Sequence, residues 1–175
     1  MEHSIATRRT LIANRWISVT EKEVSKGEKP PEKYYSLAVP DYVCVIARTI
    51  EGRFPLVRQY RPAVETQVWE FPSGTLEPGE SPEECAAREL VEETGCQAPS
   101  LISLGTFLTD VGRLENQLFA YFAGEAMEAA DFQPEENLAV HYFDRERLAN
   151  LIASGEFNFA LHLAVWEAFT RKFPQ

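Results

Sequence analysis

Three glutamates, Glu89, Glu92 and Glu93, stand within five positions of one another in the stretch GTLEPGESPEECAARELVEETGC, residues 74–96. On an α-helix, spacings of three and four place these carboxylates on one face, where each like-charged pair costs roughly 0.2–0.5 kcal/mol. Arg88 can reach Glu92 one turn on, but one cation cannot neutralise three anions. The pattern indicates a divalent-cation site, because hard oxygen ligands suit magnesium. A solvated charged face is the alternative interpretation.

These glutamates require a helix to position them, and the flanking residues predict one over about 82–94. Ser81 is a good N-cap, Pro82 suits the first helical position, and Glu84 completes a capping box. Gly95 supplies a C-terminal stop. Apolar residues beside the acidic stripe should dock this helix on a sheet; they are Ala86, Ala87, Leu90 and Val91.

The rest of the chain reads as strands followed by helices. We expect one or two short strands in residues 5–20 and a turn or exposed loop over 21–33, where Gly27 precedes a Pro-Pro pair. Apolar β-rich runs predict further strands at 42–47, 53–61 (after a turn at 51–52), 101–108, 115–126 and 138–144. Helical patterns begin near 145 and 159. This order predicts a mixed α/β arrangement.

Composition narrows the function classes. The 175 residues carry a net charge of −10, so the chain offers no electrostatic footprint for a nucleic acid. We find neither the apolar core of a signal peptide nor a stretch as long as a membrane span, and expect no membrane partner. The three cysteines, Cys44, Cys85 and Cys96, lack metal-ligand spacing and read as reduced thiols of a cytoplasmic protein.

At this point the acidic segment resembles the Nudix box, G-x5-E-x7-R-E-U-x-E-E-x-G-U, where U is bulky and apolar. Every specified position is met, by Gly74, Glu80, Arg88, Glu89, Leu90, Glu92, Glu93, Gly95 and Cys96. The stretches RQYRP and VWEFPSG resemble the subgroup that hydrolyses ADP-ribose and other nucleoside diphosphate sugars. The resemblance implies a Nudix fold, an α/β/α sandwich around a mixed β-sheet. We expect this domain over residues 39–175, after an N-terminal β-strand extension over 1–38.

The resemblance also implies roles for residues around the box. Mg²⁺ or Mn²⁺ would be held by the carboxylates of Glu89, Glu92 and Glu93 and by the backbone carbonyl of Ser73. Arg88 would orient the glutamates, and together with Glu89 and Glu93 it counts among the catalytic residues. Glu80 would either assist the metal site or brace the loop.

A general base and the substrate contacts are expected outside the box. In the subgroup the base is a glutamate on a later loop, here Glu136 in preference to Glu135, with an exposed acidic loop as the alternative. Arg61 matches the family's phosphate-binding arginine, and Arg58 either helps it or is a surface charge. Aromatic contacts to the base are expected from Trp16 and Tyr35, with packing as the alternative for Trp16. Two further tryptophans, at 69 and 166, are predicted to be core.

The predicted function is hydrolysis of the pyrophosphate bond of a nucleoside diphosphate sugar. ADP-ribose, giving AMP and ribose 5-phosphate, is the first choice. The subgroup's proline some sixteen residues beyond the box is replaced by Val111-Gly112, which keeps GDP-mannose or another nucleotide sugar open. A non-catalytic nucleotide-sugar-binding Nudix module is the alternative from another class. We also expect a homodimer, in which the apolar N-terminal strands complete the partner's pocket.

Overall fold

The computed structural model describes residues 3–134 and 138–174 and divides into two compact units. Unit 1 comprises Met1–Asp41 and Leu108–Gln117, and unit 2 comprises Tyr42–Phe107 and Leu118–Gln175, in each case over the described residues. The Nudix box lies wholly in unit 2.

Unit 1 is built on an antiparallel sheet of three strands in the order β1-β2-β3, namely β1 (His3–Ala13), β2 (Ser18–Lys26) and β3 (Lys29–Ala38). The expectation of a turn or loop over 21–33 was therefore wrong. Only a two-residue turn separates β2 from β3, opened by Gly27 at φ 61°. The two prolines, Pro30 and Pro31, are tolerated because β3 is an edge strand of this sheet, where a missing N–H need not break a ladder.

The segment Leu108–Gln117, which carries Val111-Gly112 in place of the subgroup's proline, belongs to unit 1. The backbone N–H of Leu37 donates to the carbonyl of Arg113 at 2.9 Å, and the N–H of Glu115 donates to the carbonyl of Leu37 at 3.0 Å. These bonds cover part of the β3 edge with a stretch that lies more than seventy residues later in the chain. The sequence pattern did not group this stretch with the N-terminal strands.

Unit 2 holds two sheets. The first has the order β7-β4-β10-β8, with β9 pairing β10, and the second has the order β11-β5-β6. Their strands are β4 (Tyr42–Thr49), β5 (Phe54–Arg61), β6 (Thr66–Glu70), β7 (Ser73–Thr75), β8 (Cys96–Gln97), β9 (Leu101–Leu108), β10 (Gln117–Glu128) and β11 (Leu138–Phe143). The pairing of β10 with β4 is parallel, while β7 pairs with β4 in the antiparallel sense, so the sheet is mixed as predicted. The five strands expected in this region are confirmed; the short β6, β7 and β8 were not predicted.

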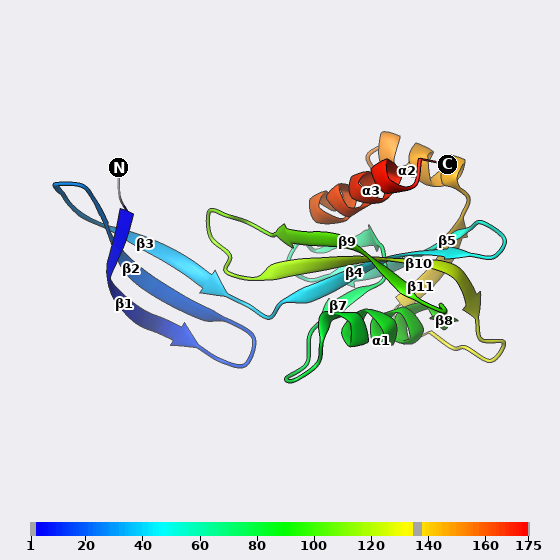
Figure 1. Cartoon of the computed structure of the whole chain (residues 1–175), viewed down its shortest axis with the longest axis horizontal. Helices are drawn as coiled ribbons and strands as arrows, with labels where there is room; N and C mark the ends of the chain where they lie inside the picture. The colour runs from blue at the N-terminus through cyan, green and yellow to red at the C-terminus, as the bar shows by residue number, and fades with distance from the viewer. Residues whose placement is uncertain (1–2, 135–137, 175) are drawn as a thin grey trace. The chain divides into compact units, whose positions relative to one another are not determined.

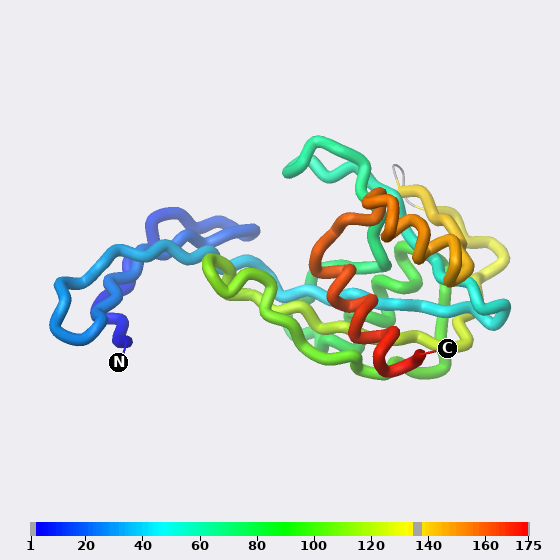
Figure 2. The backbone as a smooth tube through the Cα atoms, turned by 90° about the horizontal axis from the view of Figure 1, so that it is seen from above, coloured from blue at the N-terminus to red at the C-terminus, as the bar shows by residue number. Residues whose placement is uncertain are grey.

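Helices cover both faces of unit 2. Helix α1 (Pro82–Thr94) lies on one side, while α2 (Arg145–Ala153) and α3 (Ala160–Lys172) lie on the other (Figure 1). Seen from above, α2 and α3 overlie the strands (Figure 2). Strand β4 serves both layers, because Val43 and Val45 pack with the α1 side and Cys44 and Ile46 pack with the α2–α3 side. The α/β/α sandwich is confirmed, and this two-sided burial explains why β4 is apolar along its length.

The core contains the aromatic and sulfur residues expected there. Trp69 is buried, and the partly buried Trp166 packs against the same cluster. The three cysteines are buried free thiols, in agreement with the sequence interpretation. No helix in the described ranges is both long and apolar enough to span a membrane.

Candidate active site

Helix α1 begins and ends where the sequence predicted, and for the predicted reasons. The Ser81 hydroxyl accepts from the backbone N–H of Glu84, whose carboxylate accepts in turn from the Ser81 N–H at 2.9 Å. Gly95 closes the helix in the left-handed region at φ 68°. These caps act within a few residues of sequence, and so the extent of the helix that carries the three glutamates is set locally.

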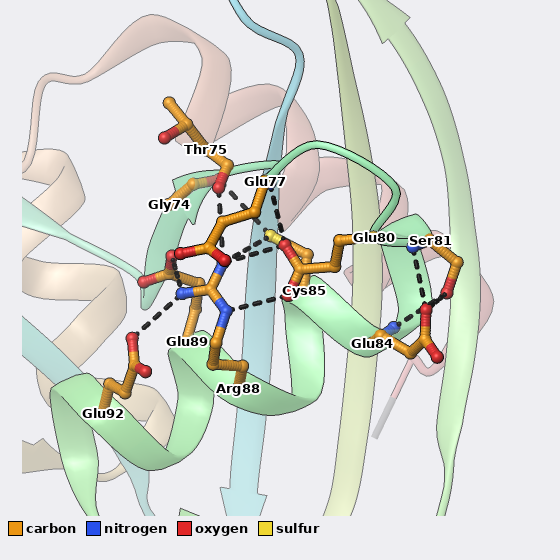
Figure 3. A network of polar contacts seen from close by, with 10 residues as sticks. All are labelled: Gly74, Thr75, Glu77, Glu80, Ser81, Glu84, Cys85, Arg88, Glu89 and Glu92. Carbon is orange, nitrogen blue, oxygen red and sulfur yellow. Dashed lines mark hydrogen bonds and ion pairs between the residues drawn. The ribbon is translucent and has the colours of Figure 1, made fainter.

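Arg88 is the centre of the polar network on this helix (Figure 3). Its Nη1 donates to Glu89 at 2.7 Å and to Glu92 at 2.9 Å, which confirms the predicted one-turn reach. Its Nε and Nη2 bind the two carboxylate oxygens of Glu80 at 2.8 and 3.0 Å. One guanidinium therefore fixes three carboxylates.

Glu80 braces the loop that precedes the helix. Its Oε2 accepts from the backbone N–H of Glu77 at 3.0 Å while both oxygens bind Arg88. The bonds from Arg88, and next the backbone N–H of Glu77, lower the pKa of Glu80 to about 2. Glu80 thus stays ionised, and both of its oxygens accept hydrogen bonds from the protein. These bonds favour a role in holding the loop in place over a role as a metal ligand.

Glu93 and Glu89 are the two box carboxylates whose pKa values are raised. Desolvation raises the pKa of Glu93 to about 8, even though its Oε2 accepts from the backbone N–H of Ser73 at 2.8 Å. Desolvation also raises the pKa of Glu89. The Glu89 carboxylate lies against Gly74, where any Cβ would overlap it, which explains the glycine that opens the box.

The donor set fits a hard divalent cation. Glu93 and Glu89 are partly buried carboxylates with raised pKa values, and a cation close to them would supply the positive charge that favours their ionised forms. Within residues 3–134 and 138–174, no three His, Cys, Asp or Glu side chains converge closely enough to hold a metal ion by themselves. An ion bound here would complete its shell with backbone carbonyl, water or substrate oxygens, as Mg²⁺ commonly does.

A cavity of about 740 Å³ adjoins the box. Its polar wall contains Glu89, Ser73 and the two side chains of an Arg61–Glu70 ion pair. The remaining wall is mostly apolar and includes Tyr42, Val64, Val68, Phe159 and Ala160. The structure thus brings the predicted phosphate-binding Arg61 and the predicted metal residues Ser73 and Glu89 to one cavity, with an apolar surface beside them.

Arg58 lies apart from this cavity. Its guanidinium carbon stands 5.2 Å from the centroid of the Trp69 ring, and it lines a different surface depression with Leu138 and His141. Its role in substrate binding stays a prediction.

The two aromatic residues expected to contact the base lie in unit 1. Trp16 is 63% exposed, and the Arg15 guanidinium carbon stands 4.4 Å from its ring centroid. The hydroxyl of Tyr35 donates to Glu21 at 2.9 Å. Glu21 also accepts from Arg9, so this carboxylate bridges strands β1 and β3.

The sequence interpretation assigned no role to two buried residues of unit 2 that lie near the site. Glu70 is fully buried beside the cavity, and His162, to which no role was assigned, is fully buried in the first turn of α3. Burial lowers the pKa of His162 to about 3, so the ring is neutral and its Nδ1 accepts from the Phe71 N–H at 3.1 Å. The position of a charged residue inside the apolar run VWEF is the sequence signal that could have identified Glu70. Glu135 and Glu136 lie outside the described residues.

Comparison with known proteins identifies the class. The model of the protein family called NUDIX domain matches residues 39–163. Because this match spans most of the chain, the protein belongs to the Nudix family, and the resemblance found in the sequence is confirmed.

Individual relatives share only a moderate fraction of the sequence with this chain. The chain is 29% identical over 159 residues to the ADP-ribose pyrophosphatase of Bacillus subtilis (strain 168), covering 89% of this chain and 86% of that protein. It is 36% identical over 107 residues to the methanol dehydrogenase activator of Bacillus methanolicus, covering 61% of this chain but only 57% of that protein. A crystal structure of an ADP compounds hydrolase has the same fold, with a TM-score of 0.86 at 20% identity over 99% of this chain and 95% of that one.

Proposed function

We propose that the protein is a metal-dependent hydrolase that cleaves the pyrophosphate bond of a nucleoside diphosphate sugar. ADP-ribose, giving AMP and ribose 5-phosphate, is the proposed substrate. The observation that carries the proposal is the shared cavity wall, where Arg61 stands with Ser73 and Glu89. An anion-binding arginine beside Glu89, whose pKa is raised by desolvation, suits a substrate that brings phosphates and a cation together. The similarity to the Bacillus subtilis ADP-ribose pyrophosphatase supports the choice of ADP-ribose.

The family resemblance assigns roles to the residues in and beside the box. Glu89, Glu92 and Glu93, with the carbonyl of Ser73, would hold Mg²⁺ or Mn²⁺. When bound, such a cation polarises pyrophosphate oxygens and lowers the pKa of an attacking water. Arg88 acts indirectly, because its Nη1 bonds hold the carboxylates of Glu89 and Glu92 in one orientation.

The remaining roles concern the substrate and the proton. Arg61 would bind the pyrophosphate through charge-assisted hydrogen bonds. A general base must accept the proton of the attacking water, and we assign this role to Glu136, with Glu135 as the neighbouring candidate. Both residues lie outside the described ranges, so this assignment depends on the resemblance alone.

We further propose a homodimer in the cytoplasm. In unit 1 the strand β1 is exposed along its length, and Ile5, Leu11, Ile12 and Trp16 are among its exposed apolar residues and those of the following turn. A two-fold interface would bury this surface and bring Trp16 and Tyr35 to the partner's nucleotide. Buried free thiols are consistent with a reducing compartment.

Incubation of the protein with a panel of nucleotide sugars and Mg²⁺, followed by identification of the products, tests the proposal. AMP and ribose 5-phosphate from ADP-ribose, abolished by EDTA, is the expected result. Release of GMP and mannose 1-phosphate from GDP-mannose, without cleavage of ADP-ribose, would show that GDP-mannose is the substrate. Tight binding of ADP-ribose without any product would instead indicate a binding module.

A further inference from the structure

The stretch from Glu70, the last residue of β6, to Ser73, the first residue of β7, lines the cavity at both ends and is tied to three other elements. Glu70 binds Arg61 of β5 through both carboxylate oxygens. The backbone N–H of the next residue, Phe71, donates to Nδ1 of His162 in α3. The N–H of Ser73 then donates to Glu93 of α1 at 2.8 Å. The same short stretch therefore links Arg61, the predicted phosphate-binding arginine, to Glu93 of the box.

Glu70 constrains Arg61 more strongly than an ordinary surface partner would. The Nε and Nη2 of Arg61 each donate to one oxygen of Glu70 at 2.6 Å. Glu70 is fully buried, whereas the Arg61 side chain is 43% exposed. Because an unpaired buried carboxylate is costly, Glu70 holds the guanidinium in the orientation that satisfies both oxygens. Such side-on pairing fixes the plane of the guanidinium as well as its position.

The pairing leaves one edge of Arg61 available. A guanidinium has five N–H donors, and Glu70 accepts from two of them. The other three donate to no residue in the described part of the chain. They include the Nη1–Nη2 edge, which matches two phosphate oxygens. Since Arg61 lines the cavity together with Ser73 and Glu89, a phosphate bound to this edge stands in the same cavity as the box carboxylates.

We propose that Glu70 is a positioning residue that holds Arg61 ready for the pyrophosphate. Glu70 touches no reacting atom and acts through Arg61. Ordering a free arginine side chain on binding costs affinity, and the buried ion pair meets this cost during folding. The inference rests on the proposed function, because it takes the anion in the cavity to be the pyrophosphate of the substrate.

A competing role for Glu70 gives the opposite prediction. If Glu70 held Arg61 away from the substrate, the phosphate would have to displace it and removal of its charge would tighten binding. Displacement would leave Glu70 buried without its two bonds, which is unfavourable. Binding at the free edge of Arg61 avoids this penalty.

The test uses Glu70→Gln, which keeps the shape of the side chain but removes its charge and one acceptor. Equilibrium titration with inorganic pyrophosphate in Mg²⁺ should show a Kd raised about 10- to 100-fold. With ADP-ribose the KM should rise by a similar factor while kcat changes little, because uniform binding is lost. In an Arg61→Ala background, Glu70→Gln should have no further effect on either constant.

The matched control is Glu167→Gln, which makes the same chemical change in an exposed pair, where Arg171 Nε donates to Glu167 at 2.7 Å. It should leave Kd and KM unchanged, and thermal unfolding should show both variants folded. If Glu70→Gln does not fold, Glu70→Asp, which keeps the charge but withdraws it by one methylene, should raise the same two constants.

Several outcomes would overturn the inference. These are an unchanged or lower Kd in Glu70→Gln, a full additional loss in the Arg61→Ala background, or a wild-type protein that does not bind pyrophosphate. The proposed function fails separately. A raised pyrophosphate Kd in Glu70→Gln, with no cleavage of ADP-ribose by the wild type, would support the positioning role and reject the substrate.

Discussion

Glu93 should destabilise the metal-free protein at alkaline pH, and Glu93→Gln should relieve this cost. Desolvation raises the pKa of Glu93 from an ordinary 4.5 to about 8 in the folded state. Between these values the folded state binds more protons than the unfolded state, so the free energy of unfolding falls as the pH rises from about 4.5 to about 8. Above about pH 8 Glu93 is ionised in both states, and its destabilising effect on the free energy of unfolding reaches its full size.

The size of the effect follows from the pKa difference. About 3.5 pKa units at about 1.4 kcal/mol per unit gives an upper value of about 5 kcal/mol. Because the Glu93 side chain is partly exposed and its surroundings relax, we expect about 2–4 kcal/mol. The amide oxygen of glutamine can still accept from the Ser73 N–H, so the substitution removes mainly the charge.

The assay is urea unfolding in EDTA at pH 5 and at pH 8.5. Glu93→Gln should be more stable than the wild type at pH 8.5, with a much smaller difference at pH 5, and it should be inactive. Saturating Mg²⁺ should narrow the difference at pH 8.5, because the cation binds and stabilises the wild type preferentially. Glu92→Gln is the control, since the Glu92 side chain is 51% exposed and its ion pair with Arg88 is worth at most about 1 kcal/mol. Equal or lower stability of Glu93→Gln at pH 8.5 without metal would refute the reasoning.

Three further predictions test the proposed roles. Glu136→Gln should lower kcat by roughly 10²–10⁴-fold with little change in metal binding; a near-normal rate there, with a collapse in Glu135→Gln, would move the role by one residue. Gly74→Ala should cut turnover severely, because its Cβ overlaps the Glu89 carboxylate, and full activity in steady-state assays would contradict this packing. Light scattering should give twice the chain mass of 19.8 kDa, and deletion of residues 1–36 should raise KM; an active monomer would exclude the shared pocket.

Local features of the site could be predicted because their causes lie within a few residues. The capping box of Ser81 and Glu84, the Gly95 stop and the reach from Arg88 to Glu92 depend on helix geometry alone, and all three are present. Patterns of apolar residues in the sequence also located the main strands of unit 2 and both C-terminal helices. The prolines after Gly27 suggested a loop that is not present, because proline, which lacks a backbone N–H, interrupts a strand only where a neighbouring strand needs that donor.

Sequence patterns alone identify the family, the helix that carries the glutamates and the excess of negative charge on that helix. Which charged groups meet across the sheet, and which of them are desolvated, depends on the tertiary structure. Arg61 and Glu70 belong to adjacent strands, and Ser73 meets Glu93 only when α1 packs on the sheet. The pKa of Glu93 depends on the same packing, since desolvation by surrounding elements raises it. Desolvation and long-range pairing are properties of the assembled core, and for this reason no local pattern encodes them.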